Sequence, residues 1–229
     1  MKDLKAKLDN VRSRIESACK QAGREPSEVT ILAVSKGHPA SRIRQLNELG
    51  LNAFGENYLQ ESVEKQALLT DLDLEWHYIG PLQSNKTREL ARNFDWVQSA
   101  DREKVLLRLS RQRPESVPKL NICIQVNIDR EEQKAGVMPE NLEELVHFTR
   151  ELPNLRLRGL MAIPLQASSH HDSSTSYRRM SELFQSLVSS GVPLDTLSMG
   201  MSADLEQAIV QGSTMLRIGT DLFGARTRR

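Results

Sequence analysis

Short apolar runs alternate with amphipathic segments along almost the whole of this 229-residue chain. A short apolar run is typical of a strand buried on both faces, whereas apolar residues spaced three and four apart indicate a helix. The runs predict strands at residues 29–36, 51–54, 76–79, 96–97, 120–128, 155–163, 196–199 and 215–218. Parallel strands need long crossover connections, and helices supply them here. The alternation therefore predicts an α/β fold with a parallel sheet.

The number of strand signals and the chain length favour one architecture. Strand–helix units repeated along 229 residues lie in the range of a (β/α)8 barrel of the TIM type. Because no linker, repeat or shift in composition divides the sequence, we expect a single domain over residues 1–229. An open, doubly wound sheet is the alternative, since the second and fourth strand signals are weak. We expect an extra N-terminal helix before the barrel, with apolar positions at Leu4, Leu8, Val11, Ile15, Ala18 and Ala22.

Charge and cysteine content argue against several kinds of partner. The chain has 31 basic and 30 acidic residues, so no overall field favours nucleic acid or a membrane surface. No apolar segment is long enough to span a bilayer, and the N-terminus lacks the apolar core of a signal peptide. Cys19 lies in a helical pattern and Cys123 in a strand pattern, which indicates two buried thiols and no disulfide. We therefore expect a cytoplasmic protein, and we expect it to be a monomer.

Lys36 closes the first apolar run. The carboxyl end of such a strand is where α/β barrels and open α/β sheets keep their active sites. Partial burial lowers the proton affinity of an ammonium, because it penalises the charged form. The neutral amine can then attack an aldehyde and form a Schiff base. On position alone, the simpler interpretation is favoured, in which the lysine leaves the sheet and extends to water.

Two segments near the C-terminus are candidates for holding a phosphate. Ser202 stands at the expected N-cap of a helix after the seventh predicted strand, where exposed N–H groups attract anions. Arg217, Gly219 and Thr220 lie at the end of the eighth strand, where glycine permits close approach of the backbone and threonine adds a hydroxyl. Loops after strands seven and eight are the recurrent phosphate site of barrel enzymes.

Taken singly, these residues have simpler explanations: a helix cap for Ser202, an ion pair for Arg217 and a tight turn for Gly219. Together with an amine on the first strand, they suggest a ligand that has both a phosphate and an aldehyde. Pyridoxal 5′-phosphate is one such ligand, and a phosphosugar substrate of a Schiff-base aldolase is another.

Several sequence blocks carry a resemblance that covers the chain from end to end. The blocks are Ala33-Val34-Ser35-Lys36, residues 54–61, the highly specific stretch from His77 to Lys86, residues 134–136, 159–161 and 198–202, and residues 217–224. With these blocks the chain resembles the pyridoxal phosphate homeostasis protein family. The resemblance implies a barrel of the alanine racemase N-terminal type, which is pyridoxal phosphate fold type III, with the cofactor held by Lys36 as an internal aldimine.

The resemblance also implies the roles of the other residues. Ser202, Gly219 and Thr220 are expected to hold the phosphate, Arg217 to lie near the pyridine nitrogen, and Asn57 to lie beside the ring. A guanidinium cannot accept a proton, so it leaves the ring nitrogen unprotonated and the ring a weak electron sink. For Asn57, a cap of the helix that begins at Tyr58 is an equal explanation.

These implications favour a cofactor carrier over an enzyme. Racemases of this type add a β-rich domain with a tyrosine base, and we expect none here because the sequence ends at Arg229. A missing acid–base partner costs about two to four orders of magnitude in rate. We therefore expect a non-enzymatic protein of pyridoxal phosphate homeostasis, with apo-enzymes as possible recipients. A weak racemase or decarboxylase is the alternative, and a Schiff-base aldolase is a remote one.

Histidines elsewhere have simpler interpretations. His170-His171-Asp172 has side chains that can bind metal, but a serine-rich loop is a poor cage, and we interpret it as solvated loop with no metal site. His77 lies inside the third predicted strand, where a core histidine with satisfied hydrogen bonds is favoured over a catalytic base.

Overall fold

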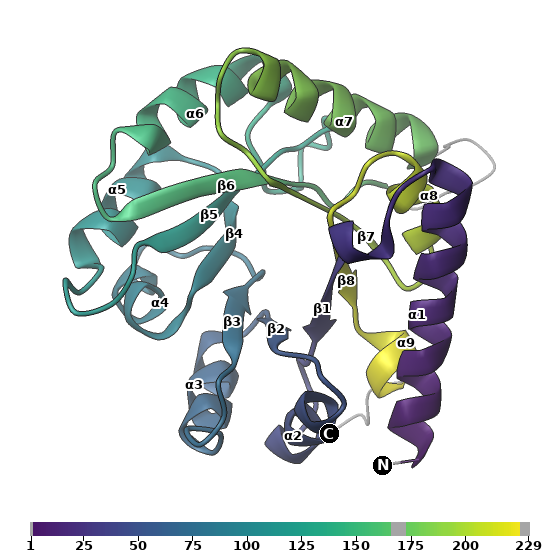
Figure 1. Ribbon diagram of the computed structural model, residues 1–229. Coiled ribbons are helices and arrows are strands. Elements are labelled where there is room, and N and C mark those ends of the chain that lie inside the picture. Colours follow the sequence, from purple (N-terminus) through teal and green to yellow (C-terminus); the bar gives the residue numbers. More distant parts are fainter. Residues whose placement is uncertain (1, 166–172, 225–229) are drawn as a thin grey trace.

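Eight parallel strands close into a barrel at the centre of the molecule (Figure 1). In this computed structural model, which describes residues 2–165 and 173–224, strands that follow each other in the chain are neighbours in the sheet. Ala33 of the first strand is in register with Ile218 of the last, so the sheet has no open edge. The barrel prediction is confirmed and the open-sheet alternative is wrong. The strands are β1 (Thr30–Val34), β2 (Ala53–Glu56), β3 (Glu75–Tyr78), β4 (Trp96–Ala100), β5 (Leu120–Gln125), β6 (Leu155–Met161), β7 (Thr196–Met201) and β8 (Met215–Ile218).

Helices follow the strands and surround the barrel (Figure 1). Short 3-10 turns, η1 (Pro26–Glu28) and η2 (Pro139–Asn141), precede β1 and α6. The helices are α1 (Lys2–Ala22), α2 (Ala40–Glu48), α3 (Leu59–Ala67), α4 (Thr87–Asn93), α5 (Glu103–Gln112), α6 (Leu142–Arg150), α7 (Ser173–Ser189), α8 (Leu205–Val210) and α9 (Thr220–Phe223).

Alternate residues of β1 and β2 face opposite sides of the barrel wall, as successive side chains of a strand must. Leu32, Val34 and Ala53 belong to a small buried cluster completed by Ile79 and Met215 from other strands. Their neighbours Ala33 and Phe54 belong to the large core shared with the helices. The first side chains therefore point into the barrel and the second point outward.

The extra N-terminal helix is present as expected. Helix α1 lies along α8 and α9 on the outside of the barrel (Figure 1). Burial of a leucine side chain contributes about 1.5–3 kcal/mol, so α1 is an integral part of the core. Gly23 ends the helix with φ +66°, a left-handed conformation that glycine adopts without strain. The buried residues of α1 are Leu4, Leu8, Val11, Ile15, Ala18 and Cys19.

Element boundaries differ from the sequence predictions in instructive places. Strand β2 runs two residues further than residue 54, because Gly55 and Glu56 pair with His77 and Tyr78 of β3. Helix α4 begins at Thr87, with Lys86 in the N-cap position.

Helix α5 begins at Glu103. Arg102 occupies the N-cap position, and the Asp101 carboxylate accepts a hydrogen bond from the Arg102 guanidinium at 2.7 Å.

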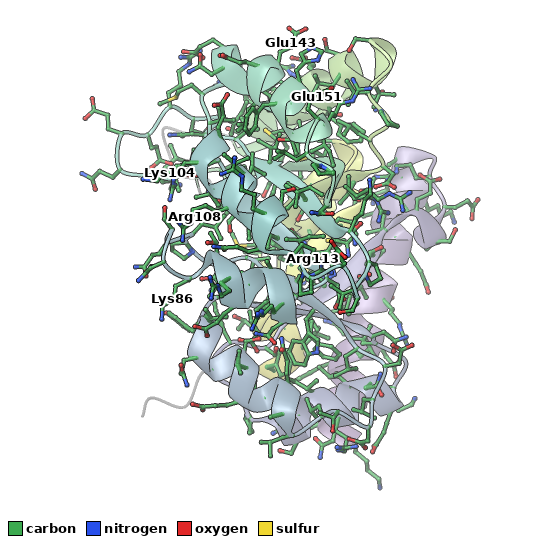
Figure 2. The ribbon with its side chains drawn as sticks, turned by 90° about the vertical axis from the view of Figure 1, so that its left-hand side faces the viewer. Lys86, Lys104, Arg108, Arg113, Glu143 and Glu151 are labelled. Carbon is green, nitrogen blue, oxygen red and sulfur yellow. The ribbon has the colours of Figure 1, made fainter. Side chains whose placement is uncertain are left out.

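Basic side chains on the face of α4 and α5 differ in what they contact (Figure 2). Arg113, which follows α5, is buried and donates to the carbonyl oxygens of Ala91 and Phe94 at 2.7 Å each. Arg108 Nε donates to the Thr87 hydroxyl at 3.1 Å. These two arginines join α5 to α4. Arg113 satisfies carbonyl oxygens at the C-terminal end of α4 that have no partner within the helix, and Arg108 bonds the hydroxyl of Thr87, the first residue of α4.

The two cysteines match the expectation from sequence. Cys19 and Cys123 are buried free thiols, and burial raises the pKa of Cys123 above its ordinary value. Within the described ranges, no helix has the length and apolar character needed to cross a membrane. The His170-His171-Asp172 segment lies outside the described residues.

Candidate functional site

Lys36 and Asn57 lie at the carboxyl ends of neighbouring strands. Lys36 stands two residues beyond β1, and Asn57 directly follows β2. The backbone N–H of Ser35 donates to the Gly55 carbonyl at 3.0 Å, so the pairing of these strands continues past the end of β1. Both Lys36 and Asn57 are partly buried.

Gly219 lies against the end of β1. A Cβ atom at this position would stand 3.5 Å from the carbonyl oxygen of Val34 and 3.6 Å from its Cβ. Val34 is only two residues from Lys36, and Thr220 follows Gly219 as the first residue of α9. The predicted amine and the predicted phosphate turn therefore lie at the same end of the barrel, on strands that pair directly.

A hydrogen bond to Ser202, which follows β7, links this segment to the turn after β8. The backbone N–H of Asp221 donates to the Ser202 hydroxyl at 3.3 Å. The structure thus brings Ser202 beside the Gly219–Thr220 turn, as a common phosphate site requires.

The helix-cap interpretation of Ser202 is wrong. Helix α8 begins at Leu205, and Asp204 occupies the N-cap position. Asp204 organises the loop before the helix, since its carboxylate accepts hydrogen bonds from the Met201 N–H at 2.6 Å and the Tyr177 hydroxyl at 2.8 Å. Ser202 therefore stands in the loop itself.

Arg14 of α1 contacts the segments that follow β7 and β8, from outside the barrel. Its guanidinium donates to Glu206 of α8 at 2.6 Å, to Asp221 of α9 at 2.5 Å and to the Ser202 carbonyl at 2.9 Å. The hydrogen bond from Arg14 lowers the pKa of Glu206 below its ordinary value, against the opposing effect of burial. The N-terminal helix thereby fixes the relative position of the loops after β7 and β8.

Arg217 is buried inside the barrel, 5% exposed. Its Nη1 donates to the carbonyl oxygen and the hydroxyl of Ser198 at 2.8 and 2.9 Å, and its Nη2 donates to the Ala162 carbonyl at 2.8 Å. Burial lowers the pKa of Arg217, while the nearby Tyr177 and Asp204 oppose this shift. A guanidinium held on carbonyls is a fixed hydrogen-bond donor and not a rim ion pair.

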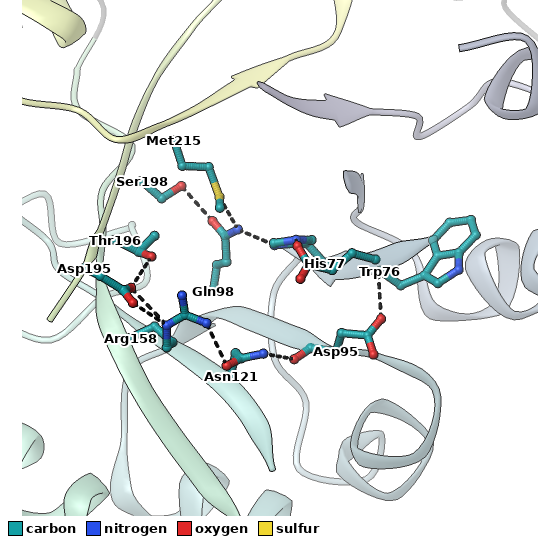
Figure 3. A network of polar contacts seen from close by, with 11 residues as sticks. Trp76, His77, Asp95, Gln98, Asn121, Arg158, Asp195, Thr196, Ser198 and Met215 are labelled. Atoms are coloured by element: carbon teal, nitrogen blue, oxygen red, sulfur yellow. Dashed lines mark hydrogen bonds and ion pairs between the residues drawn. The ribbon is translucent and has the colours of Figure 1, made fainter. Parts of the chain in front are cut away.

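A chain of hydrogen bonds runs from Arg217 toward the opposite end of the barrel. The Ser198 hydroxyl, which accepts from Arg217, donates to Gln98 Oε1 at 2.7 Å. Gln98 Nε2 bonds His77 Nδ1 at 2.8 Å, and His77 Nε2 bonds Glu75 at 2.7 Å (Figure 3). A side-chain amide nitrogen can only donate, so His77 Nδ1 accepts the hydrogen bond from Gln98 Nε2. The neutral His77 ring therefore carries its proton on Nε2, which donates to Glu75. The expectation of a satisfied core histidine is confirmed.

Asn57 has an acceptor without a partner. Its Oδ1 is buried and accepts no hydrogen bond from any described residue. The N-cap of α3 is Tyr58 and has no side-chain cap bond, so the helix-cap explanation of Asn57 fails. Gly80 fixes the backbone here, because a Cβ on Gly80 would lie only 2.1 Å from the Asn57 carbonyl oxygen. A bound ligand with a hydroxyl donor would satisfy this atom.

A cavity of ≈ 240 Å³ lies in another sector of the same barrel end, beyond β5. Asn127, Lys134 and Ile163 are among its lining residues, and Lys134 Nζ donates to the Ile163 carbonyl at 3.4 Å. None of the six predicted site residues lines it.

Sequence reasoning missed Arg14, Glu56 and Lys65. The last two join the Ser35 hydroxyl and carbonyl in a buried cluster beside Lys36. Only Glu56 had a signal in the sequence, because it is an acidic residue at the end of the apolar second strand. Lys65 and Arg14 follow helical patterns of solvent-exposed charge. Only the folded chain shows that Lys65 is buried and that Arg14 contacts the loops after β7 and β8.

Comparisons with known proteins agree with this geometry. The family model "Alanine racemase, N-terminal domain" matches residues 6–227. The pyridoxal phosphate homeostasis protein of Pseudomonas aeruginosa is 51% identical over 226 residues, covering 99% of this chain and 97% of its own length. The protein of the same name from Escherichia coli strain K12 is 48% identical over 229 residues, covering 99% and 98%.

Solved structures give the same result. PipY of Synechococcus elongatus without pyridoxal phosphate superposes with a TM-score of 0.85 at 36% identity, covering 96% of this chain and 100% of that one. An alanine racemase of Clostridium difficile shares the fold alone, with a TM-score of 0.76 at 14% identity over 100% of this chain and 58% of its own. Near-complete coverage at about half identity places this chain in the pyridoxal phosphate homeostasis protein family, whose barrel is of the alanine racemase N-terminal type.

Proposed function

We propose that this chain binds pyridoxal 5′-phosphate through a Schiff base with Lys36 and acts as a carrier of the cofactor inside the cell. Two relatives are named for pyridoxal phosphate homeostasis, and PipY has also been solved with pyridoxal phosphate bound. The single observation that carries the proposal is the shared barrel end, where Gly219 touches Val34 two residues before Lys36.

Lys36 would supply the covalent bond. Its neutral amine attacks the aldehyde carbon, a C=N bond forms, and the aldehyde oxygen leaves as water with both amine protons. An incoming amine reverses the bond by exchange, which would release the cofactor to an apo-enzyme.

Ser202, Gly219 and Thr220 would hold the phosphate. The contact between Ser202 and the Asp221 N–H brings both turns together, and glycine at 219 leaves the backbone open to close approach. Hydroxyl and backbone donors of this kind suit phosphate oxygens.

Arg217 and Asn57 would orient the ring. Arg217 holds only donors, so a pyridine nitrogen facing it would stay unprotonated. The buried, unpartnered Oδ1 of Asn57 fits a ring hydroxyl, which would donate to it. Pyridoxal phosphate supplies an electron sink in enzymes that protonate its ring nitrogen, and the donor at position 217 weakens that sink.

The three tyrosines support a carrier over a racemase. Tyr177 donates to Asp204, and burial raises the pKa of Tyr177 above its ordinary value, so its phenol stays protonated at neutral pH and cannot accept a proton as a base. Tyr78 donates to the Pro81 carbonyl at 3.1 Å, and Tyr58 is 59% exposed. No tyrosine in this set is both unengaged and enclosed, as a second base opposite Lys36 would need to be.

The direct test is Lys36→Ala, with Lys104→Ala on the exposed face of α5 as the matched control. After incubation with pyridoxal phosphate and reduction by borohydride, peptide mass mapping should show the adduct at Lys36 in the wild type and the control. The Lys36→Ala protein should keep its melting temperature. Before reduction, it should lack the visible absorption of the Schiff base that the wild type shows. An undiminished adduct on another lysine would contradict the assignment.

A second measurement separates the carrier from an enzyme. Deuterium wash-in at the α-carbon of an amino acid panel should be no faster than with free pyridoxal phosphate. Exchange accelerated about a hundredfold or more would show an acid–base catalyst and a racemase or decarboxylase activity.

A further inference from the structure

A buried lysine beside Lys36 has each of its three donor positions directed at an acceptor. Lys65 of α3 is 6% exposed, and its Nζ donates to the Ser35 carbonyl at 2.8 Å and to Glu56 at 2.6 Å. It also pairs with Glu61 at 2.6 Å. An ammonium has three N–H donors, so these contacts saturate it. An aldehyde could react at Lys65 only after these three contacts were broken.

The acceptors of Lys65 also hold the residues on both sides of Lys36. Glu56 Oε1 accepts a hydrogen bond from the Ser35 hydroxyl at 2.6 Å. Glu61 Oε1 accepts one from the Gly37 N–H at 2.6 Å. Gly37 adopts φ +74°, so the chain turns sharply directly after Lys36. The turn is thus held on each side by a carboxylate, and one ammonium bridges the two carboxylates.

This cluster occupies the outer side of the barrel wall, where α3 packs. Alternation along β1 and β2 points Val34 inward and Phe54 outward. Continued past the strand ends, it places Ser35 and Glu56 on the outer side with Lys65. The same alternation turns Lys36 and Asn57 toward the barrel interior.

Stability alone does not account for the cluster. Burial of charged groups costs several kcal/mol per ion, and apolar replacements of buried ion pairs are often equally stable. Glu56 is fully buried, its Oε2 lacks a described hydrogen-bond partner, and burial raises its pKa. The cluster instead holds the backbone on both sides of Lys36, through its contacts to Ser35 and Gly37.

We propose that Glu56, Lys65 and Glu61 form a positioning clamp for Lys36, which sets its amine for bond formation with the aldehyde. The clamp rests on the proposed function. It should affect the covalent step more than the retention of the phosphate, because Ser202, Gly219 and Thr220 lie in the turns after other strands, β7 and β8.

Glu61 offers the cleanest test, because its side chain is 31% exposed and its removal spares the core. Glu61→Ala removes the acceptor for Gly37 and should slow adduct formation about tenfold, as expected for a displaced reacting group. Glu61→Gln keeps an oxygen at that position and should restore most of the rate. The measurements are stopped-flow absorbance for the covalent step and equilibrium dialysis of phosphate-bearing pyridoxine 5′-phosphate, which lacks the aldehyde, for retention.

Lys65→Met provides a second variant, with Lys5→Met as control, since Lys5 forms an exposed pair with Asp9. Lys65→Met should also slow adduct formation, and peptide mapping should find no adduct at Lys65 in Lys36→Ala protein. A merely structural cluster would lower the melting temperature and weaken pyridoxine 5′-phosphate binding in proportion to the covalent step.

The outcomes separate the clamp from the function on which it rests. If the wild type forms no adduct at Lys36, the proposed function fails. If the wild type does form it and Glu61→Ala forms it at the same rate, the function stands and the clamp is refuted.

Discussion

Two groups of buried polar side chains, one toward each end of the barrel, differ in how far the chain itself satisfies them. Toward the amino end, Arg158 donates to Asp195 at 2.8 Å and to Asn121 at 3.2 Å, and Gln98 bonds both His77 and Ser198 (Figure 3). At the carboxyl end, Asn57 Oδ1 is buried without a described partner. Polar groups that satisfy each other stabilise a fold, whereas unsatisfied ones are tolerated where a ligand completes them. Asn57 Oδ1 lies at the predicted site, unlike the unpartnered Gln112 Oε1 at the end of α5. We therefore assign a stabilising role to the first group and a binding role to Asn57.

Gln98→Leu should break the satisfied end and have the largest effect. The substitution leaves His77 Nδ1 without a donor and the Ser198 hydroxyl without its acceptor, both in the barrel interior. Each unsatisfied buried group costs about 1–3 kcal/mol, so the free energy of unfolding should fall by about 2 kcal/mol or more. Urea unfolding followed by circular dichroism measures it. Gln112→Leu is the matched control, because Gln112 Oε1 is buried without a partner and its loss should cost little.

Asn57→Ala should show the reverse pattern at the unsatisfied end. Removal of an unpartnered buried acceptor leaves the free energy of unfolding nearly unchanged or slightly higher. Binding of pyridoxal phosphate should weaken by about tenfold, which corresponds to one lost hydrogen bond of about 1.4 kcal/mol. Fluorescence titration measures the dissociation constant, with Asn93→Ala on exposed α4 as control. A stability loss like that of Gln98→Leu would remove the distinction between the two ends.

The sequence predicted the barrel because apolar alternation is a local property. Strand β8 was placed at its observed bounds, since polar Thr214 and turn-forming Gly219 flank its apolar run. Lys36 and Gly219 could be assigned to one end for the same reason, because parallel strands share a direction. The prediction of Ser202 as the N-cap is wrong because serine and aspartate both favour that position. The residue at which the helix begins decides between Ser202 and Asp204, and it selects Asp204.

Tertiary contacts between charges were beyond sequence reasoning. Arg14 and Ser202 are far apart in the chain, and no periodic pattern links them. Lys65 likewise follows an ordinary helical pattern of charge, yet the fold buries it against Glu56. A charged residue on an amphipathic helix is usually solvated, so its burial could be found only by assembling the barrel.

Arg14→Met tests whether the brace outside the barrel belongs to the binding end, and its effect should be the smallest. The Arg14–Glu206 pair is partly exposed, with side chains 28% and 45% accessible, so its removal should cost under about 1 kcal/mol. If this free-energy cost destabilises only the complex with pyridoxal phosphate, the dissociation constant for pyridoxal phosphate rises by up to about fivefold.

The pH dependence identifies the pair that is responsible. The Arg14 hydrogen bond lowers the pKa of folded Glu206 below its ordinary 4.5. A lowered carboxyl pKa contributes stability that is complete above pH 4.5 and lost as the pH falls through the folded value. The stability difference between wild type and Arg14→Met should therefore be largest near neutral pH and shrink in acid, and it should also shrink in high salt. A difference that stays constant from pH 7 to pH 3 would mean that Arg14 acts through packing of its methylene groups, and the loops after β7 and β8 would then owe their positions to α1 as a whole.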